Sequence, residues 1–136
     1  MRVGFLLLAD EVRVHEVDAT IDVVRDGQGI VPVDPAAPRL DRAVALEMVC
    51  EPADVDVPRT VCLDLVAPGD EHLGRVRIEI IAWYRSESGR PPEGSHPLRY
   101  AIRLQTPLPG PGRHRVVVSC DEVPLAELAF LVVAAE

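Results

Sequence analysis

The stretches RVRIEI (residues 75–80), LRYAIRLQ (98–105) and RHRVVVSC (113–120) decide the fold class of this chain, because two kinds of side chain alternate along each of them. One set of alternate positions is apolar apart from one histidine. It consists of Val76, Ile78, Ile80, Leu98, Tyr100, Ile102, Leu104, His114, Val116 and Val118. Alternation with a period of two is typical of strands in a half-buried antiparallel sheet. The pattern predicts three such strands.

The opposite positions of the same stretches carry two arginines each. They are Arg75, Arg77, Arg99, Arg103, Arg113 and Arg115. Solvated arginines on the outer face of a sheet would be an ordinary arrangement. Like charges on neighbouring strands repel, however, so an arginine cluster without interleaved acids favours an acidic partner. The sequence leaves both interpretations open, and the second predicts docking of a protein partner or self-association through an Arg-rich sheet face.

The net charge is unevenly distributed along the chain. Six arginines stand against fifteen acids in residues 1–72, and eight against seven in residues 73–136, within a total of −8. The acidic first half of another copy could therefore meet the Arg-rich face. An acidic chain is a poor general binder of nucleic acids or anionic membranes. The Arg-rich face leaves a nucleic-acid contact as a weaker alternative.

Composition limits both the size of the protein and its chemistry. A chain of 136 residues with 48% hydrophobic residues is long enough for one domain with its own core, residues 1–136. Only 4% of the residues are aromatic, so valine, leucine, isoleucine and alanine must form most of that core. The chain has no lysine, which excludes a P-loop lysine and a Schiff-base lysine.

Three cysteines (Cys50, Cys62 and Cys120) have neither a CxxC motif nor metal-ligand spacing. Their odd number indicates reduced thiols and a cytoplasmic protein, with Cys50 and Cys120 on core faces and Cys62 on the opposite face. Residues 1–11 resemble a signal peptide, but the apolar run is short and two acids follow it. A first core strand is the better interpretation.

Further strands are expected in residues 3–9, 19–24, 30–33, 61–65 and 123–133, separated by turns that contain glycine, proline or acidic residues. Residues 3–9 form an apolar run suited to a strand covered on both sides. Residues 43–50 place Val44, Leu46, Met48 and Cys50 on one face of a strand, although their composition would also suit a short helix. The expected fold is an all-β antiparallel β-sandwich of about eight to nine strands, with immunoglobulin-like or similar topology.

The order of three segments resembles a family of small uncharacterised bacterial single-domain proteins. These segments are Phe5–Asp10, Ile30-Val31-Pro32 with Pro38-Arg39-Leu40, and Pro111–Val116 before a final hairpin. The resemblance covers most of the chain, but its motifs are structural. It implies a β-sandwich and supplies no catalytic residues, and His114 or Arg115 replaces the aromatic residue that is usual after the Pro-Gly pair.

A second function class is a small-ligand-binding or enzymatic sandwich that uses the polar loop of residues 85–97. Trp83, Tyr84 and Tyr100 flank this loop and would approach one another if their strands pair. They could form a ligand platform, or they could close the end of the core. Ser95-His96 lies in the loop, but no nucleophile motif surrounds it.

The metal-ligand candidates are few and scattered. They are Asp70-Glu71-His72, His15-Glu16, and the pair Asp54 and Asp56. No calcium-loop motif or histidine-ligand spacing is present, and exposed acids on turns need no metal to explain them. The expectation from the sequence is a non-enzymatic protein-binding or assembly module with no cofactor and no metal.

Overall fold

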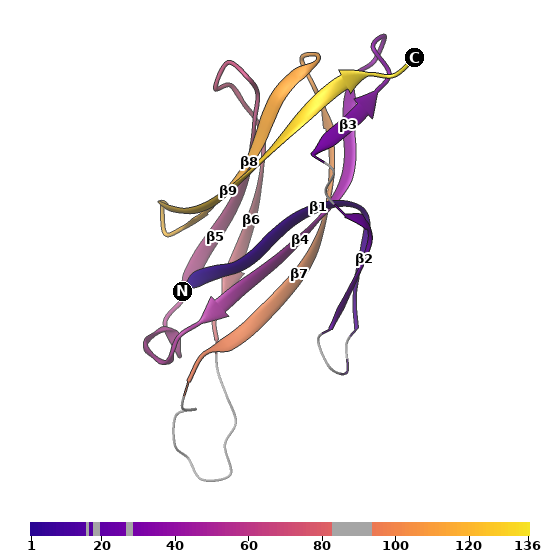
Figure 1. The fold of residues 1–136 in the computed structure, drawn as a ribbon. Helices are drawn as coiled ribbons and strands as arrows, with labels where there is room; N and C mark the ends of the chain where they lie inside the picture. Colours follow the sequence, from indigo (N-terminus) through magenta and orange to yellow (C-terminus); the bar gives the residue numbers. More distant parts are fainter. Residues whose placement is uncertain (16, 18–19, 27–28, 83–93) are drawn as a thin grey trace.

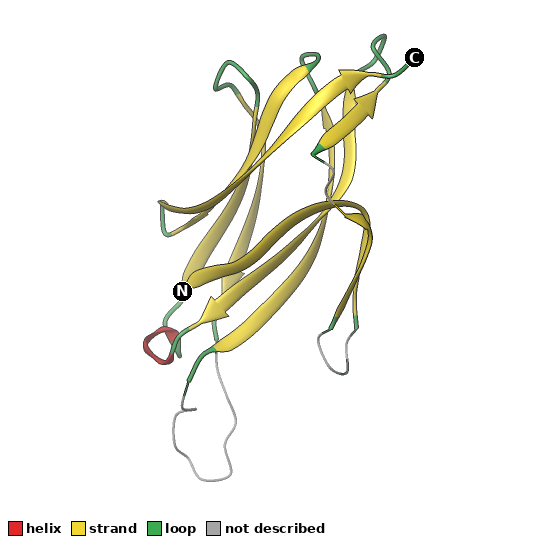
Figure 2. Ribbon diagram, viewed as in Figure 1, coloured by secondary structure: helices red, strands yellow, loops and turns green. Residues whose placement is uncertain are grey.

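A computed structural model describes residues 1–15, 17, 20–26, 29–82 and 94–136 (Figure 1). Within these ranges the chain forms nine β-strands and one short 3-10 turn, Pro52–Asp54, and no α-helix (Figure 2). The strands are β1 Arg2–Val14, β2 Ile21–Asp26, β3 Ile30–Val33, β4 Arg39–Cys50, β5 Arg59–Val66, β6 His72–Ile80, β7 His96–Pro107, β8 Gly112–Cys120 and β9 Val123–Ala134. The prediction of an all-β fold is confirmed.

The strands belong to two sheets. The order is β2-β1-β4-β7 in the four-stranded sheet and β3-β9-β8-β5-β6 in the five-stranded sheet. All pairs are antiparallel except β3 with β9, which run parallel from Ile30 opposite Leu131 to Val33 opposite Ala134. The expectation of purely antiparallel sheets is therefore wrong at this edge, because β3 reaches β9 through a crossing between sheets and not through a hairpin.

Residues 43–50 are the inner part of strand β4 and not a helix. β4 lies between β1 and β7 and pairs with both, so its backbone groups are satisfied on two sides. Val44, Leu46, Met48 and Cys50 are all buried, as the alternation predicts. The pairing of neighbouring strands outweighs the helix propensity of alanine, leucine and methionine.

The first strand is confirmed, but its predicted cover on both sides is only partly right. Leu8 and Ala9 are buried, whereas Gly4 is exposed and the rest of residues 3–9 are half-buried. β1 also continues to Val14, five residues beyond its predicted end.

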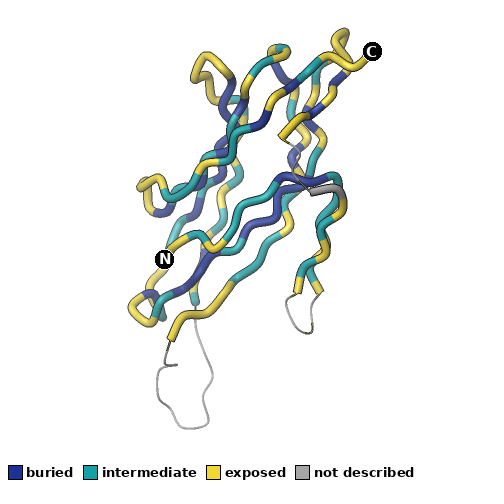
Figure 3. Tube along the Cα trace, viewed as in Figure 1, coloured by how far each residue is buried: buried dark blue, intermediate teal, exposed yellow. Residues whose placement is uncertain are grey.

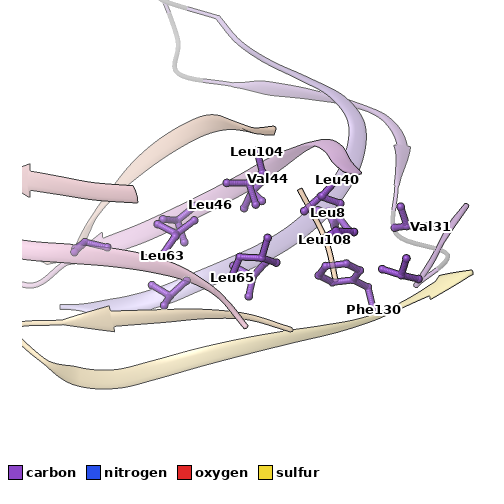
Figure 4. Packing of buried hydrophobic residues seen from close by; sticks show 14 of the residues in the cluster. Leu8, Val31, Leu40, Val44, Leu46, Leu63, Leu65, Leu104, Leu108 and Phe130 are labelled. Atoms are coloured by element: carbon purple, nitrogen blue, oxygen red, sulfur yellow. The ribbon is translucent and has the colours of Figure 1, made fainter. Parts of the chain in front are cut away.

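One hydrophobic cluster joins the inward faces of the two sheets (Figure 4). Leu46 and Leu104 come from the four-stranded sheet, and Leu63, Val116 and Phe130 come from the five-stranded sheet. Buried and less buried positions alternate along β8, which is half-buried in this way from Arg113 to Cys120 (Figure 3). The predicted apolar sides of residues 75–80, 98–105 and 113–120 are therefore the sides that form the core.

The last two strands form the predicted hairpin around Asp121 and Glu122. Both residues have positive φ, +48° and +70°. Two consecutive left-handed residues are the requirement of a type I′ turn, whose twist matches that of the flanking strands. This tight turn fixes the register in which Cys120 faces Val123.

Candidate protein-binding surface

The six arginines predicted to share one face lie on two different sheets. The four on β6 and β8 flank β5 in the five-stranded sheet, whereas Arg99 and Arg103 lie on β7, an edge of the four-stranded sheet. The prediction of one continuous Arg-rich face is therefore wrong. Alternation fixes the side of its own sheet that a residue faces, but it does not fix which strands are neighbours.

Acidic side chains neutralise the arginines of β6. Arg75 binds Asp64, directly opposite on β5, with 2.7 Å from Nε to Oδ1 and 3.2 Å from Nη2 to Oδ2. The hydrogen bond to Asp64, and then its charge, raise the pKa of Arg75. Arg77 Nη2 lies 3.2 Å from Glu79 Oε1. Each arginine of β6 thus has an acidic neighbour in the same molecule.

The arginines of β7 and β8 are paired in the same way. The shortest N···O distances are 2.8 Å for Arg99 with Glu47, 2.8 Å for Arg103 with Asp41, and 2.8 Å and 3.2 Å for Arg115 with Asp70 and Glu127. Among the residues that the structure describes, Arg113 is the one of the six without an acid at ion-pair distance. The premise that acids are not interleaved with the arginines is therefore wrong.

The outer face of the five-stranded sheet contains an open hollow of about 790 Å³ over β5, β6 and β8. Three of the predicted arginines line it, together with the half-buried thiol of Cys62. Asp64, Asp121 and Glu122 line the same hollow. Because acids balance the guanidinium groups, the hollow has no excess positive charge with which to select an anion.

A second opening, which we call the edge crevice, lies between β6 and β7 and has a volume of about 230 Å³. Buried core side chains form its floor. They are Leu63, Leu65, Leu104 and Val116. Arg75 of β6 and Arg103 of β7 also line the crevice. It therefore combines an apolar interior with one guanidinium from each edge strand.

The opening of the edge crevice depends on a residue without a side chain. Gly74 of β6 lines it opposite Thr106 of β7, and a Cβ at Gly74 would lie 3.7 Å from Thr106 Oγ1. This distance is an ordinary van der Waals contact, and the φ of Gly74 is not in the left-handed region. A larger side chain can therefore replace Gly74 without backbone strain and would fill the opening.

Sequence reasoning missed the edge crevice, and it also missed a projecting pair of strands, residues 10–15 and 20–26, which we call the arm. β1 pairs with β4 through residues 2–9, with both strands at Ala9, and then with β2 alone through residues 11–14 (Figure 1). β2 is an edge strand with no other strand partner among the described residues. The signal that could have revealed the arm is the alternation of Val12 and Val14, repeated in the predicted strand of residues 19–24.

The two faces of the arm differ in character. Val12 opposite Val23 and Val14 opposite Ile21 form an apolar face, because directly opposed residues share a side of the ladder. The other face carries one ion pair and one histidine–aspartate contact. They join Arg13 to Glu11, with 2.8 Å from Nη2 to Oε1, and His15 to Asp22, with 2.7 Å from Nε2 to Oδ2.

No family model matches this chain, and no curated protein matches it either. The resemblance to a family of small bacterial proteins therefore stays a prediction. The site must be interpreted from its own residues.

Tyr100 lies where the prediction of a core-closing aromatic places it, half-buried against the hydrophobic cluster. Burial raises the pKa of its hydroxyl. β6 and β7 belong to different sheets, so their predicted pairing, which would have brought the aromatics together, does not occur. Trp83, Tyr84 and residues 85–93 of the polar loop lie outside the described residues.

The acidic metal candidates have other partners. Asp54 is buried and binds the N-terminal ammonium of Met1, 2.8 Å from Oδ2, and Arg59 Nη2, 2.8 Å from Oδ1. Asp70 pairs with Arg115, and His72 Nδ1 lies 3.7 Å from Asp64 Oδ1. Among the described residues no three His, Cys, Asp or Glu side chains group as metal ligands, and no helix is long and apolar enough to span a bilayer.

The core face of β8 contains a fully buried histidine, as predicted. His114 Nδ1 lies 3.0 Å from the Gly112 carbonyl oxygen, and the ring stacks on Phe130 with centroids 5.8 Å apart. Nε2 has no hydrogen-bond partner. Because a carbonyl oxygen only accepts hydrogen bonds, Nδ1 donates the one to Gly112.

Proposed function

We propose that this chain is a non-enzymatic protein-binding or assembly module. The observation that supports this most is the edge crevice, where both sheets end in edge strands on the same side of the molecule. Edge strands present backbone N–H and C=O groups to which another chain can add a strand. Here the two edges also flank an opening to the core, so an added segment could bury apolar side chains in addition to pairing its backbone.

The strand order supports an immunoglobulin-like sandwich as the scaffold of this module. Such folds have sheets of strands A-B-E-D and C-F-G, with C′ added beside C in the variable type. β1, β4 and β7 take the places of A, B and E, and β5, β8 and β9 take those of C, F and G, with β6 beside C. No described strand takes the place of D, which would lie at the free edge of β7.

The proposed location is the cytoplasm, which the three free thiols support. Burial raises the pKa of the Cys50 and Cys120 thiols, and nearby Asp54 and Asp121 respectively raise them further. Thiols held in the protonated form are poor nucleophiles. These two cysteines therefore act as small apolar side chains of the core.

Substitution at Gly74 tests the proposed function. Affinity capture with the wild type, Gly74→Leu and the control Gly69→Leu would be followed by reassembly of each complex from purified components. Gly69 is a suitable control because it lies in a turn where an added Cβ meets nothing within 4 Å. We expect at least one protein, another chain or this one, to bind Gly74→Leu at least tenfold more weakly. If every partner binds both variants equally, the edge crevice is not the binding site.

A further inference from the structure

The arm has an apolar face that is only half-buried in one copy of the chain, and its partner can be inferred from the rest of the chain. A two-stranded hairpin by itself is at best marginally stable in water. Val12, Val14, Ile21 and Val23 form the apolar face of this one, and Val17 at its tip is fully exposed. We propose that the arm of one copy docks on the edge crevice of a second copy, so that the chain assembles with itself; this rests on the proposed function.

The first argument is apolar complementarity. The edge crevice reaches buried leucine and valine side chains of the core, and the arm presents valine and isoleucine side chains in two adjacent cross-strand pairs. Val12 and Val14 lie on the same side of β1 as the core residue Leu8, two and three alternations further along the strand. The arm thus continues a core-facing side beyond its own core, and the edge crevice is an opening lined by core residues of the other copy.

The second argument is charge. Residues 10–26 contain six acids and two arginines, a net charge of −4, which is half of the net charge of the whole chain. Strands β6 and β7 together contain four arginines and one glutamate, a net charge of +3. Although single arginines are paired within the monomer, this separation of charge attracts the arm of one copy to the edge strands of another.

The third argument is strand pairing. β2 at one end of the four-stranded sheet and β7 at its other end each have a single strand partner among the described residues. When β2 of one copy pairs with β7 of the next, the sheet continues across the junction. Ile21 and Val23 then turn toward the crevice, and Asp22 turns to the outer face that carries Arg103. The arm and the edge crevice are different surfaces of the chain, so the contact is heterologous and can continue from copy to copy.

Analytical ultracentrifugation of four chains tests this proposal. They are the wild type, the arm variant Val23→Glu, the edge-crevice variant Gly74→Leu and the control Gly69→Leu. We expect the wild type and the control to associate between micromolar concentrations and about 1 mM, the weak end of specific binding. Each of the other two variants should lower the association constant at least tenfold. Neither substitution replaces a residue of the hydrophobic cluster, and circular dichroism checks that both chains keep their strand content.

Mixing the two impaired variants is the decisive measurement. Val23→Glu retains an intact crevice and Gly74→Leu retains an intact arm, so their equimolar mixture should form dimers that neither variant forms alone. Raising the salt from about 0.1 M to 1 M should weaken these dimers, since it shortens the Debye length from about 10 Å to 3 Å.

Three outcomes would overturn the proposal: a wild type that is monomeric throughout, a variant that associates as the wild type does, or a mixture that stays monomeric. The proposed function would survive the first outcome if another protein still bound the wild type and lost its affinity for Gly74→Leu. It would fail, together with this inference, if Gly74→Leu changed no binding at all.

Discussion

Replacing Asp54 by asparagine should cost this protein a large part of its stability. The Asp54 side chain is 2% exposed and accepts hydrogen bonds from the Met1 ammonium, the Glu51 N–H and the Arg59 guanidinium. Burial alone would raise the pKa of this carboxyl, but the ammonium, the Glu51 N–H and Arg59 together outweigh burial and lower it. The carboxylate is therefore charged in the folded protein.

The size of this loss of stability depends on the Met1 ammonium, which keeps its charge when Asp54 is replaced. The Met1 side chain is 1% exposed and the residue as a whole is half-buried, so Asp54→Asn leaves a partly buried ammonium facing a neutral amide. Breaking a buried ion pair from one side costs about 3–5 kcal/mol. Arg59 is 30% exposed and keeps its second partner, Asp121, which places the expected loss near the lower end, about 3 kcal/mol.

Urea unfolding at neutral pH measures this loss. With a slope of about 2 kcal/mol per molar for a domain of this size, the midpoint should fall by about 1.5 M. Asp121→Asn is the matched control, because it removes the exposed partner of the same arginine and should lower the midpoint less. A fall below about 0.5 M for Asp54→Asn would refute the argument that the Met1 ammonium and Arg59 depend on this buried carboxylate.

Three further predictions concern pH, the free thiols and Gly74. The pKa values of Asp54, Asp41 and Asp121 are lowered on folding, so their stabilisation is complete above the unfolded value of about 3.9 and is lost as the pH falls through the lowered values. Urea midpoints between about pH 7 and pH 2.5 should show this fall, and Asp54→Asn should make it shallower. Neither a reductant nor a chelator should move the melting temperature by more than about 2 °C. A shift of about 10 °C with the reductant would indicate a structural disulfide, and one with the chelator would indicate a structural metal site. Gly74→Leu should raise the free energy of unfolding by about 0.5–1 kcal/mol, because it reduces the freedom of the unfolded chain, and a loss measured by urea unfolding would show that the contact with Thr106 is strained.

The repeated pairing of the arginines bears on any account of binding. Each exposed ion pair contributes only about 0.5 kcal/mol to the free energy of unfolding. Their larger effect here is to remove the uncompensated charge that would make a sheet face attract acids by itself. The selectivity of the proposed assembly therefore depends on the apolar faces of the arm and the crevice, with the separation of charge along the chain guiding their approach.

The alternation of side chains determined the strands and their faces. Val116 and Val118 are buried and Arg115 faces outward, because side chains of a strand point alternately to its two sides whatever its neighbours are. The same reasoning placed Leu46 and Met48 in the core although their composition suited a helix. It also placed His114 inside, where Phe130 covers it. These properties belong to one strand at a time, so the sequence of that strand is sufficient.

The neighbours of each strand were decided only by the tertiary structure. Arg99 meets Glu47 and Arg103 meets Asp41, partners 52 and 62 residues away, because β7 crosses to the other sheet and does not pair with β6. No local pattern encodes that crossing, since a strand with one polar side fits the edge of either sheet. The sequence by itself therefore determined which side each arginine faces, whereas the packing of two sheets decided what lies beside it, and with that the edge crevice and the free arm.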